Sequence, residues 1–75
     1  MAQSLNQIFS VNVRAQRTAR GISQEKLAEL SGLHRTYLGQ VERAETNVTL
    51  EVVDSIASAL DLEPTSLLLE VVGRG

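Results

Sequence analysis

Four polar residues near the middle of the chain combine the spacing of one helix face with side chains that can bind nucleic-acid bases. They are Arg35, Thr36, Gln40 and Arg43. Residues three and four positions apart lie on the same side of a helix. Arginine can donate hydrogen bonds to guanine, glutamine can pair with adenine, and threonine can contact the thymine methyl group. The alternative is an ordinary solvated helix surface, and the elements around this face decide between the two.

The elements that must position this face are all helical. Apolar residues recur at intervals of three and four, as at Leu5, Ile8 and Phe9, and no strand pattern, internal repeat or linker interrupts them. A chain of 75 residues has room for only one core. We therefore predict a single all-α domain over residues 1–75, with its core over about 5–70 and a short C-terminal tail. We expect a compact bundle of five short helices over about residues 5–20, 23–31, 34–43, 50–60 and 64–70.

Local residues mark where the predicted helices begin and end. Ser23 and Thr49 are suited to cap the free backbone N–H groups of the second and fourth helices. Gly21 and Gly32 are suited to follow the ends of the first and second helices. Pro64 fits the first turn of the fifth helix, where its missing N–H group is not needed.

The second and third predicted helices form a tight pair joined by Ser31–Leu33. A short turn that contains glycine sets two helices at a steep angle, so the second helix can present its outer face. The face that begins at Arg35 is therefore expected to point away from the core. Leu30 on the second helix and Leu50 on the fourth are expected to face inward.

The segment from Gly21 to Leu38, with the sequence GISQEKLAELSGLHRTYL, and the following Val41–Arg43 resemble the phage-repressor (Cro/XRE) helix-turn-helix family. Residues 47–51 and 56–60 fit the same pattern, so the resemblance covers about residues 9–69. The start of the third helix, His-Arg-Thr-Tyr, and the small size are similar to the controller proteins of restriction–modification systems. The resemblance implies a lambda-repressor-like fold and a transcriptional regulator that binds double-stranded DNA.

The resemblance also implies a role for individual residues. The positions that match base contacts are Arg35, Thr36, Tyr37 and Gln40. The positions that match phosphate contacts are Ser23, Gln24, His34 and Arg43. Two alternatives stay open, because the Tyr37 ring can instead pack against the second helix and His34 can be a plain surface residue.

Two positions match an internal contact of the family rather than a DNA contact. Arg17 and Glu42 fall where an ion pair often joins the first and third helices. The chain also departs from the family pattern at several positions. Gln16 stands where a core residue is usual, and His34 replaces the usual Ser, Thr or Asp cap. Glu45 and Thr46 occupy a loop that is commonly basic, so contacts from that loop stay open.

The charge is unevenly distributed along the chain. The net charge of −2 by itself argues against a nucleic-acid partner. However, residues 14–43 hold six of the seven basic residues and only three of the nine acidic ones. This asymmetry indicates one face for an anion and another face for a different purpose, with chance clustering as the alternative.

The C-terminal part of the chain holds more apolar residues than one buried helix face can use. We expect some of them to form a homodimer surface, so that the regulator binds an inverted-repeat operator. The alternative is that they only close the core. The apolar groups available for this surface are Leu50 and those from Leu60 to Val72. The residues expected at the dimer interface are Leu60, Leu62, Leu67 and Leu69, with Val71 and Val72 following in the tail.

Several classes of function find no support in the sequence. The chain has no cysteine and one histidine, which excludes thiolate and multi-histidine metal sites, and no catalytic motif is present. We therefore expect no enzyme activity, no cofactor and no small-molecule ligand. No apolar stretch is long enough for a membrane span or a signal peptide, so the cytoplasm is the expected compartment. A helical module that binds a protein partner, such as an antitoxin, remains the rival interpretation.

Overall fold

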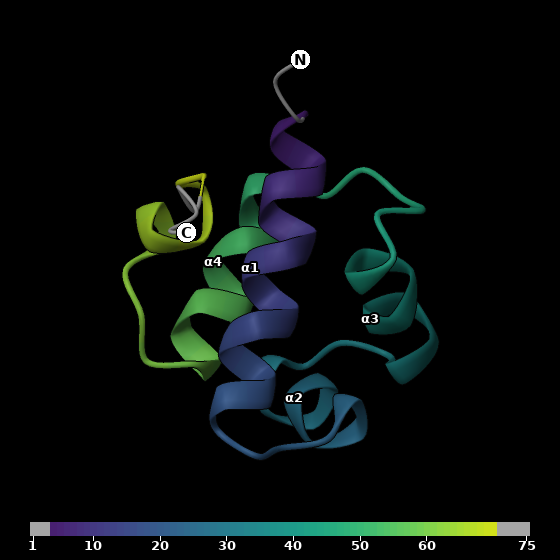
Figure 1. Ribbon diagram of the computed structural model, residues 1–75. Helices are drawn as coiled ribbons and strands as arrows, with labels where there is room; N and C mark the ends of the chain where they lie inside the picture. The colour runs from purple at the N-terminus through teal and green to yellow at the C-terminus, as the bar shows by residue number, and fades with distance from the viewer. Residues whose placement is uncertain (1–3, 71–75) are drawn as a thin grey trace.

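The structure is a computed structural model that describes residues 4–70, and these residues form α-helices and one 3₁₀ turn, without a strand. Figure 1 shows α1 running through the middle of the molecule, with α3 and η1 on opposite sides of it. No helix within the described range is long and apolar enough to cross a membrane. The elements are α1 (Leu5–Ala19), α2 (Gln24–Ser31), α3 (Arg35–Glu42), α4 (Leu50–Ala59) and the 3₁₀ helix η1 (Pro64–Leu67).

Side-chain caps fix where the helices begin. Ser4 and Gln7 form a reciprocal capping box at α1, in which each side chain accepts a hydrogen bond from the other residue's backbone N–H at 3.1 Å. The hydroxyl of Ser23 accepts from the backbone N–H of Lys26, and the hydroxyl of Thr49 caps α4 in the same way. The predicted caps at Ser23 and Thr49 are confirmed.

The α2–α3 pair has the predicted short turn. Gly32 follows α2 with a φ of 72°, a left-handed conformation that favours glycine because it lacks a Cβ. The N–H of Leu33 then donates to the carbonyl of Ala28 at 2.9 Å, which ends α2 and redirects the chain. The half-buried Leu33 packs against the core. The turn therefore fixes the orientation of α3 relative to α2.

The predicted fifth helix is wrong, because residues 64–67 form only one 3₁₀ turn. The N–H of Ser66 donates to the carbonyl of Glu63, and the N–H of Leu68 to that of Thr65, with the three-residue spacing of a 3₁₀ helix. The buried side chain of Asn12 explains why the turn does not continue. Its amide donates to the carbonyls of Leu67 and Leu69 at 2.9 and 2.8 Å, and these bonds hold the segment away from a helical path.

The core lies where α1, α2, α3, α4 and η1 meet, and all five elements contribute to it. Leu30 and Leu50 do not belong to it, although we expected both to face inward: they are 50% and 82% exposed. Both lie beside the buried stripes of short helices, whose narrow apolar faces leave neighbouring positions in solvent. The buried apolar residues are Phe9, Val13, Leu27, Ala28, Leu38, Val41, Val53, Ile56, Ala57, Leu60 and Leu67.

Replacement of Asn12 by alanine is expected to lower the free energy of unfolding by about 1–3 kcal/mol, because the buried carbonyl of Leu67 and the partly buried carbonyl of Leu69 lose their donor. Urea unfolding followed by circular dichroism measures this loss. Asn47→Ala, which removes the same side chain from an exposed loop position, serves as the control and should change stability little. Equal stability of the two variants would contradict the role of Asn12 as the clamp of the C-terminal segment.

Candidate nucleic-acid interface

Helix α3 divides its side chains between the core and the surface. Leu38 and Val41 are buried, whereas Arg35 and Thr36 are exposed at its N-terminal end. Gln40 lies one turn further on and is half-buried. Of the four predicted base-contacting residues, Arg35 and Thr36 are thus exposed, and Gln40 is accessible in part.

Tyr37 occupies an intermediate position between core and surface. It is half-buried and packs against the hydrophobic core, to which Leu27 and Ala28 of α2 belong. A tyrosine can bury its ring and still present its hydroxyl group at the surface. Packing therefore accounts for the ring of Tyr37, and any contact to DNA stays a prediction.

A buried ion pair ties α3 to α1. The Nε of Arg17 lies 2.7 Å from Oε2 of Glu42, and Nη2 of Arg17 donates to Oε1 of Glu42 at 3.0 Å. The side chain of Glu42 is 1% exposed and that of Arg17 is 15% exposed. The hydrogen bond from Arg17 to Glu42 raises the pKa of Arg17 above its ordinary value. The predicted internal pair is confirmed.

The same carboxylate also holds the start of α2. The Nε2 of Gln24 donates to Oε1 of Glu42 at 2.9 Å, and Nη1 of Arg17 donates to the carbonyl of Ile22 at 2.9 Å. One N–H of the Gln24 amide is thereby used inside the protein, and the second remains for another acceptor. Gln24 and the capping residue Ser23 thus stand together at the N-terminus of α2, where backbone N–H groups favour an anion.

His34 caps α3 in place of the Ser, Thr or Asp that is usual there. Its Nδ1 accepts a hydrogen bond from the backbone N–H of Thr36 at 3.1 Å, and the residue is exposed. A neutral imidazole that accepts at Nδ1 carries its proton on Nε2. His34 therefore positions Thr36 and keeps a donor for a second partner.

Arg43 is paired within the protein. Its Nε lies 3.0 Å from Oε2 of Glu45, and both side chains are more than half exposed. The hydrogen bond between them raises the pKa of Arg43 and lowers that of Glu45. Arg43 follows the last residue of α3, and its predicted phosphate contact stays a prediction. The sequence analysis singled out Glu45 only as an acidic residue in a commonly basic loop and did not predict this pairing.

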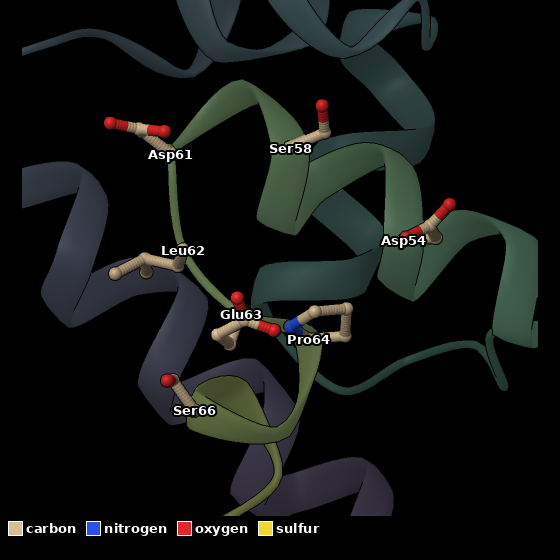
Figure 2. A pocket seen from close by; sticks show the side chains of 7 residues that line it. All are labelled: Asp54, Ser58, Asp61, Leu62, Glu63, Pro64 and Ser66. Carbon is tan, nitrogen blue, oxygen red and sulfur yellow. The ribbon is translucent and has the colours of Figure 1, made fainter.

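The acidic half of the chain forms a shallow hollow between α4 and η1. Figure 2 shows Asp54, Asp61 and Glu63 around it, with the carboxylates of Asp54 and Asp61 directed to opposite sides. No group of three His, Cys, Asp or Glu side chains within residues 4–70 could hold a metal ion. The hollow is therefore an acidic surface whose described side chains do not form a metal site.

The structure corrects two residues of the expected dimer surface. Leu60 and Leu67 are 1% and 0% exposed, because both complete the core of a single chain. Leu62 is half-buried, and Leu69 is 67% exposed. Val71 and Val72 lie outside the described residues. Of the four leucines expected at a dimer interface, only Leu69 presents most of its side chain to solvent.

A different set of apolar residues is exposed near the N-terminus of α1. Leu5, Leu50 and Leu68 line a mostly apolar hollow where α1, α4 and the segment after η1 meet. Leu5 is 58% exposed and Leu50 is 82% exposed. Leu50 and Leu68 belong to the apolar second half that was expected to join two copies. The part played by Leu5 was missed, because its helical spacing is compatible with burial.

The helix-turn-helix family matches residues 13–67. Control protein C.SmaI of Serratia marcescens is 50% identical over 64 residues, covering 85% of this chain and 76% of the relative. Control protein C.BamHI of Bacillus amyloliquefaciens is 39% identical over 69 residues, covering 91% and 85%. The crystal structure of the restriction–modification controller protein C.AhdI from Aeromonas hydrophila superposes with a TM-score of 0.80 at 50% identity, covering 83% of this chain and 94% of that one.

Removal of Glu42 tests the buried network. Glu42→Ala is expected to lower the free energy of unfolding by about 3 kcal/mol, because it leaves the largely buried Arg17 without its partner. Thermal and urea unfolding measure the effect. Glu29→Ala is the matched control, since Glu29 is 73% exposed and its pairing with Lys26 contributes about 0–1 kcal/mol.

A double variant separates the loss of the ion pair from the penalty of an unpaired charge. Arg17→Met/Glu42→Leu is expected to recover part of the stability lost in Glu42→Ala, because no buried charge remains unpaired. If Glu42→Ala were no less stable than Glu29→Ala, the network would not hold the three helices together.

Proposed function

The chain belongs to the helix-turn-helix family of the phage-repressor (Cro/XRE) type, and from this premise we propose that it is a sequence-specific DNA-binding transcription regulator. The observation that carries the proposal is the exposed face of α3, which presents Arg35 and Thr36 on a helix held by a tight turn. In this family the second helix of the motif enters the major groove with its N-terminal residues at the base edges. The chain is a regulator and not an enzyme.

We assign base reading to the exposed end of α3. Arg35 can donate two hydrogen bonds to a guanine, and Thr36 can contact a thymine methyl group. Gln40 lies one turn further along the same face, where a glutamine can pair with adenine. We assign Tyr37 to the edge of this set: it is half-buried and packs against the core, and a tyrosine in such a position can still present its hydroxyl group at the surface.

Phosphate contacts are assigned to the ends of the two motif helices. Ser23 and Gln24 stand at the N-terminus of α2, where free backbone N–H groups attract a phosphate. His34 keeps one ring N–H for an acceptor, and Arg43 carries its charge at the other end of α3. Such contacts fix the position of the protein on the duplex and carry no sequence information.

We further propose that the chain is the controller of a restriction–modification system. C.SmaI and C.BamHI are described as control proteins and C.AhdI as a restriction–modification controller protein. Half of the aligned residues are identical to those of C.SmaI, and the alignment covers most of both chains. The proposed targets are therefore promoters of the genes of such a system.

The proposed working unit is a homodimer. One recognition helix reads only a few base pairs, which is too little to find one site in a genome. A second copy supplies a second recognition helix, and a two-fold axis places the two helices about 34 Å apart on one side of the duplex. The operator is then an inverted repeat.

The apolar surface around Leu5, Leu50 and Leu68 supports a second copy as its occupant. Leu69 follows Leu68 directly and is 67% exposed. Leu5, Leu50 and Leu69 are exposed and Leu68 is half-buried. Several exposed leucines on a small chain are typical of an association surface. We therefore propose that this surface is the dimer interface. It includes Leu69, as expected from the sequence, but not Leu60 and Leu67, which are buried.

Arg35→Ala tests base reading. It is expected to weaken binding to a duplex selected by the unsubstituted protein from a random library by about 1–3 kcal/mol, and to weaken binding to a mixed-sequence duplex much less. Fluorescence anisotropy at fixed salt measures both affinities. Arg14→Ala, an exposed arginine of α1, is the charge-matched control. Equal losses on the two duplexes would make Arg35 a phosphate contact, and no selected sequence at all would favour the protein-binding module.

Aspartate at the apolar surface tests the dimer. Leu50→Asp and Leu69→Asp are each expected to convert a dimer into a monomer, because a charge cannot be buried between two copies without a partner. Analytical ultracentrifugation at micromolar concentration measures the change. Leu30→Asp introduces the same charge at an exposed leucine of α2 and should leave the dimer intact. A monomer that binds one half-site tightly, or a dimer that survives both substitutions, would contradict this interface.

A further inference from the structure

The backbone turns sharply after α3, so that the carboxylate of Glu45 lies beside the end of this helix. Ala44 has a φ of 55°, a left-handed conformation that costs free energy for a residue with a Cβ. The N–H of Glu45 donates to the carbonyl of Gln40 at 2.9 Å. This turn places Oε2 of Glu45 3.0 Å from Nε of Arg43.

The guanidinium group of Arg43 lies over Gly39 and does not extend past the end of the helix. A Cβ built on Gly39 would stand 3.1 Å from Nη1 of Arg43, so the missing side chain makes the space that the group occupies. Gly39 lies four residues after Arg35 and four residues before Arg43, on the same face of the helix. It is nevertheless buried. The cation of Arg43 therefore lies beside the last turn of α3, on the face that begins at Arg35.

Arg43 and Glu45 form an ion pair at the protein surface. The hydrogen bond with Arg43 lowers the pKa of Glu45, so the carboxylate is ionised at neutral pH. Both side chains are more than half exposed, and such pairs are weak because water and salt screen them. A stronger or closer anion can therefore take the place of Glu45.

We propose that Glu45 is an affinity-setting residue that competes with DNA phosphate for Arg43 and holds the guanidinium over Gly39 until DNA displaces it. This inference rests on the proposed DNA-binding function and concerns the strength of binding. A phosphate that binds Arg43 must share the guanidinium with Glu45 or displace it. The gain in binding free energy is smaller than that from an arginine without an internal partner. Where the guanidinium stays shared with Glu45, fewer counterions are released from the DNA.

The test uses Glu45→Gln in the full chain, with two probes: a duplex selected by the unsubstituted protein and a mixed-sequence duplex. The substitution removes the charge and keeps the size of the side chain. We expect about two- to fivefold tighter binding to both probes, because the released contact goes to a phosphate and carries no sequence information. The slope of log affinity against log salt should become steeper by up to about 0.9, the value for one additional phosphate contact.

A double-mutant cycle with Arg43→Gln separates competition from simple repulsion between Glu45 and DNA. If Glu45 acts through Arg43, the gain from Glu45→Gln shrinks when Arg43 is already replaced. Glu63→Gln is the control for the change in net charge, because Glu63 is exposed and directly precedes η1, on the other side of α1 from α3 (Figure 1). Thermal unfolding of each variant shows whether the fold is kept.

Three outcomes would overturn the inference. An equal gain in both Arg43 backgrounds would mean that Glu45 only repels DNA. A loss of affinity confined to the selected duplex would mean that Glu45 orients Arg43 for base reading. Unchanged affinity and salt dependence would mean that the pair does not influence binding. If the unsubstituted chain bound neither duplex at low salt, the proposed function itself would fail, which is a result distinct from these three.

Discussion

The buried carboxylate of Glu42 is the interaction on which the arrangement of the other parts depends. It accepts hydrogen bonds from Arg17 on α1 and Gln24 on α2, while its own backbone belongs to α3. Burial of a charge has a large desolvation cost, which only a well-placed set of donors can offset. Here both carboxylate oxygens are satisfied, and α1 is joined to the two helices of the proposed interface, α2 and α3, at one point. The relative placement of α2 and α3 therefore depends on polar geometry as well as on apolar packing.

A second polar contact, made by the side chain of Asn12, holds the C-terminal segment against α1. Small domains bury a modest fraction of their surface, so single interactions carry a large share of their stability. Asn12 uses one amide group to hold two carbonyls of the C-terminal segment, and this places Leu67 in the core and leaves Leu69 at the surface. The segment that completes the monomer is thus continuous with the surface proposed for a second copy. Folding and dimer formation are expected to depend on each other for this reason.

The proposed DNA-binding face combines fixed and movable side chains. His34 and Ser23 are engaged as helix caps, and Gln24 is held by Glu42, so their positions are set before DNA arrives. Arg35 and Thr36 are exposed at the first turn of α3. A preorganised frame lowers the entropy cost of binding, while the exposed side chains can adjust to the bases. Arg43 differs from both groups, because its charge is already paired in the free protein.

The local sequence determined the helices and the chemistry of the site. Capping residues such as Ser23 and Thr49, the glycine after α2 and the apolar spacing predicted four helices close to their observed positions, since these signals act within one or two turns. The resemblance to a helix-turn-helix family singled out the exposed face of α3 and the Arg17–Glu42 pair. Local signals could not decide the fate of residues 64–70, where Pro64 is compatible with an α-helix as well as with a 3₁₀ turn.

Tertiary structure decided what depends on residues distant in the sequence. The amide of Asn12 reaches residues 67 and 69, more than fifty positions away, and this contact replaces the expected fifth helix by one turn. Burial of Leu67 and exposure of Leu50 likewise depend on which neighbours cover each side chain, and helical spacing alone is compatible with either outcome. The pairing of Arg43 with Glu45 required the left-handed turn at Ala44. The sequence by itself determined which side chains this protein can offer to DNA, and only the folded backbone decided which of them are already engaged, because hydrogen bonds and burial are set by distance in space.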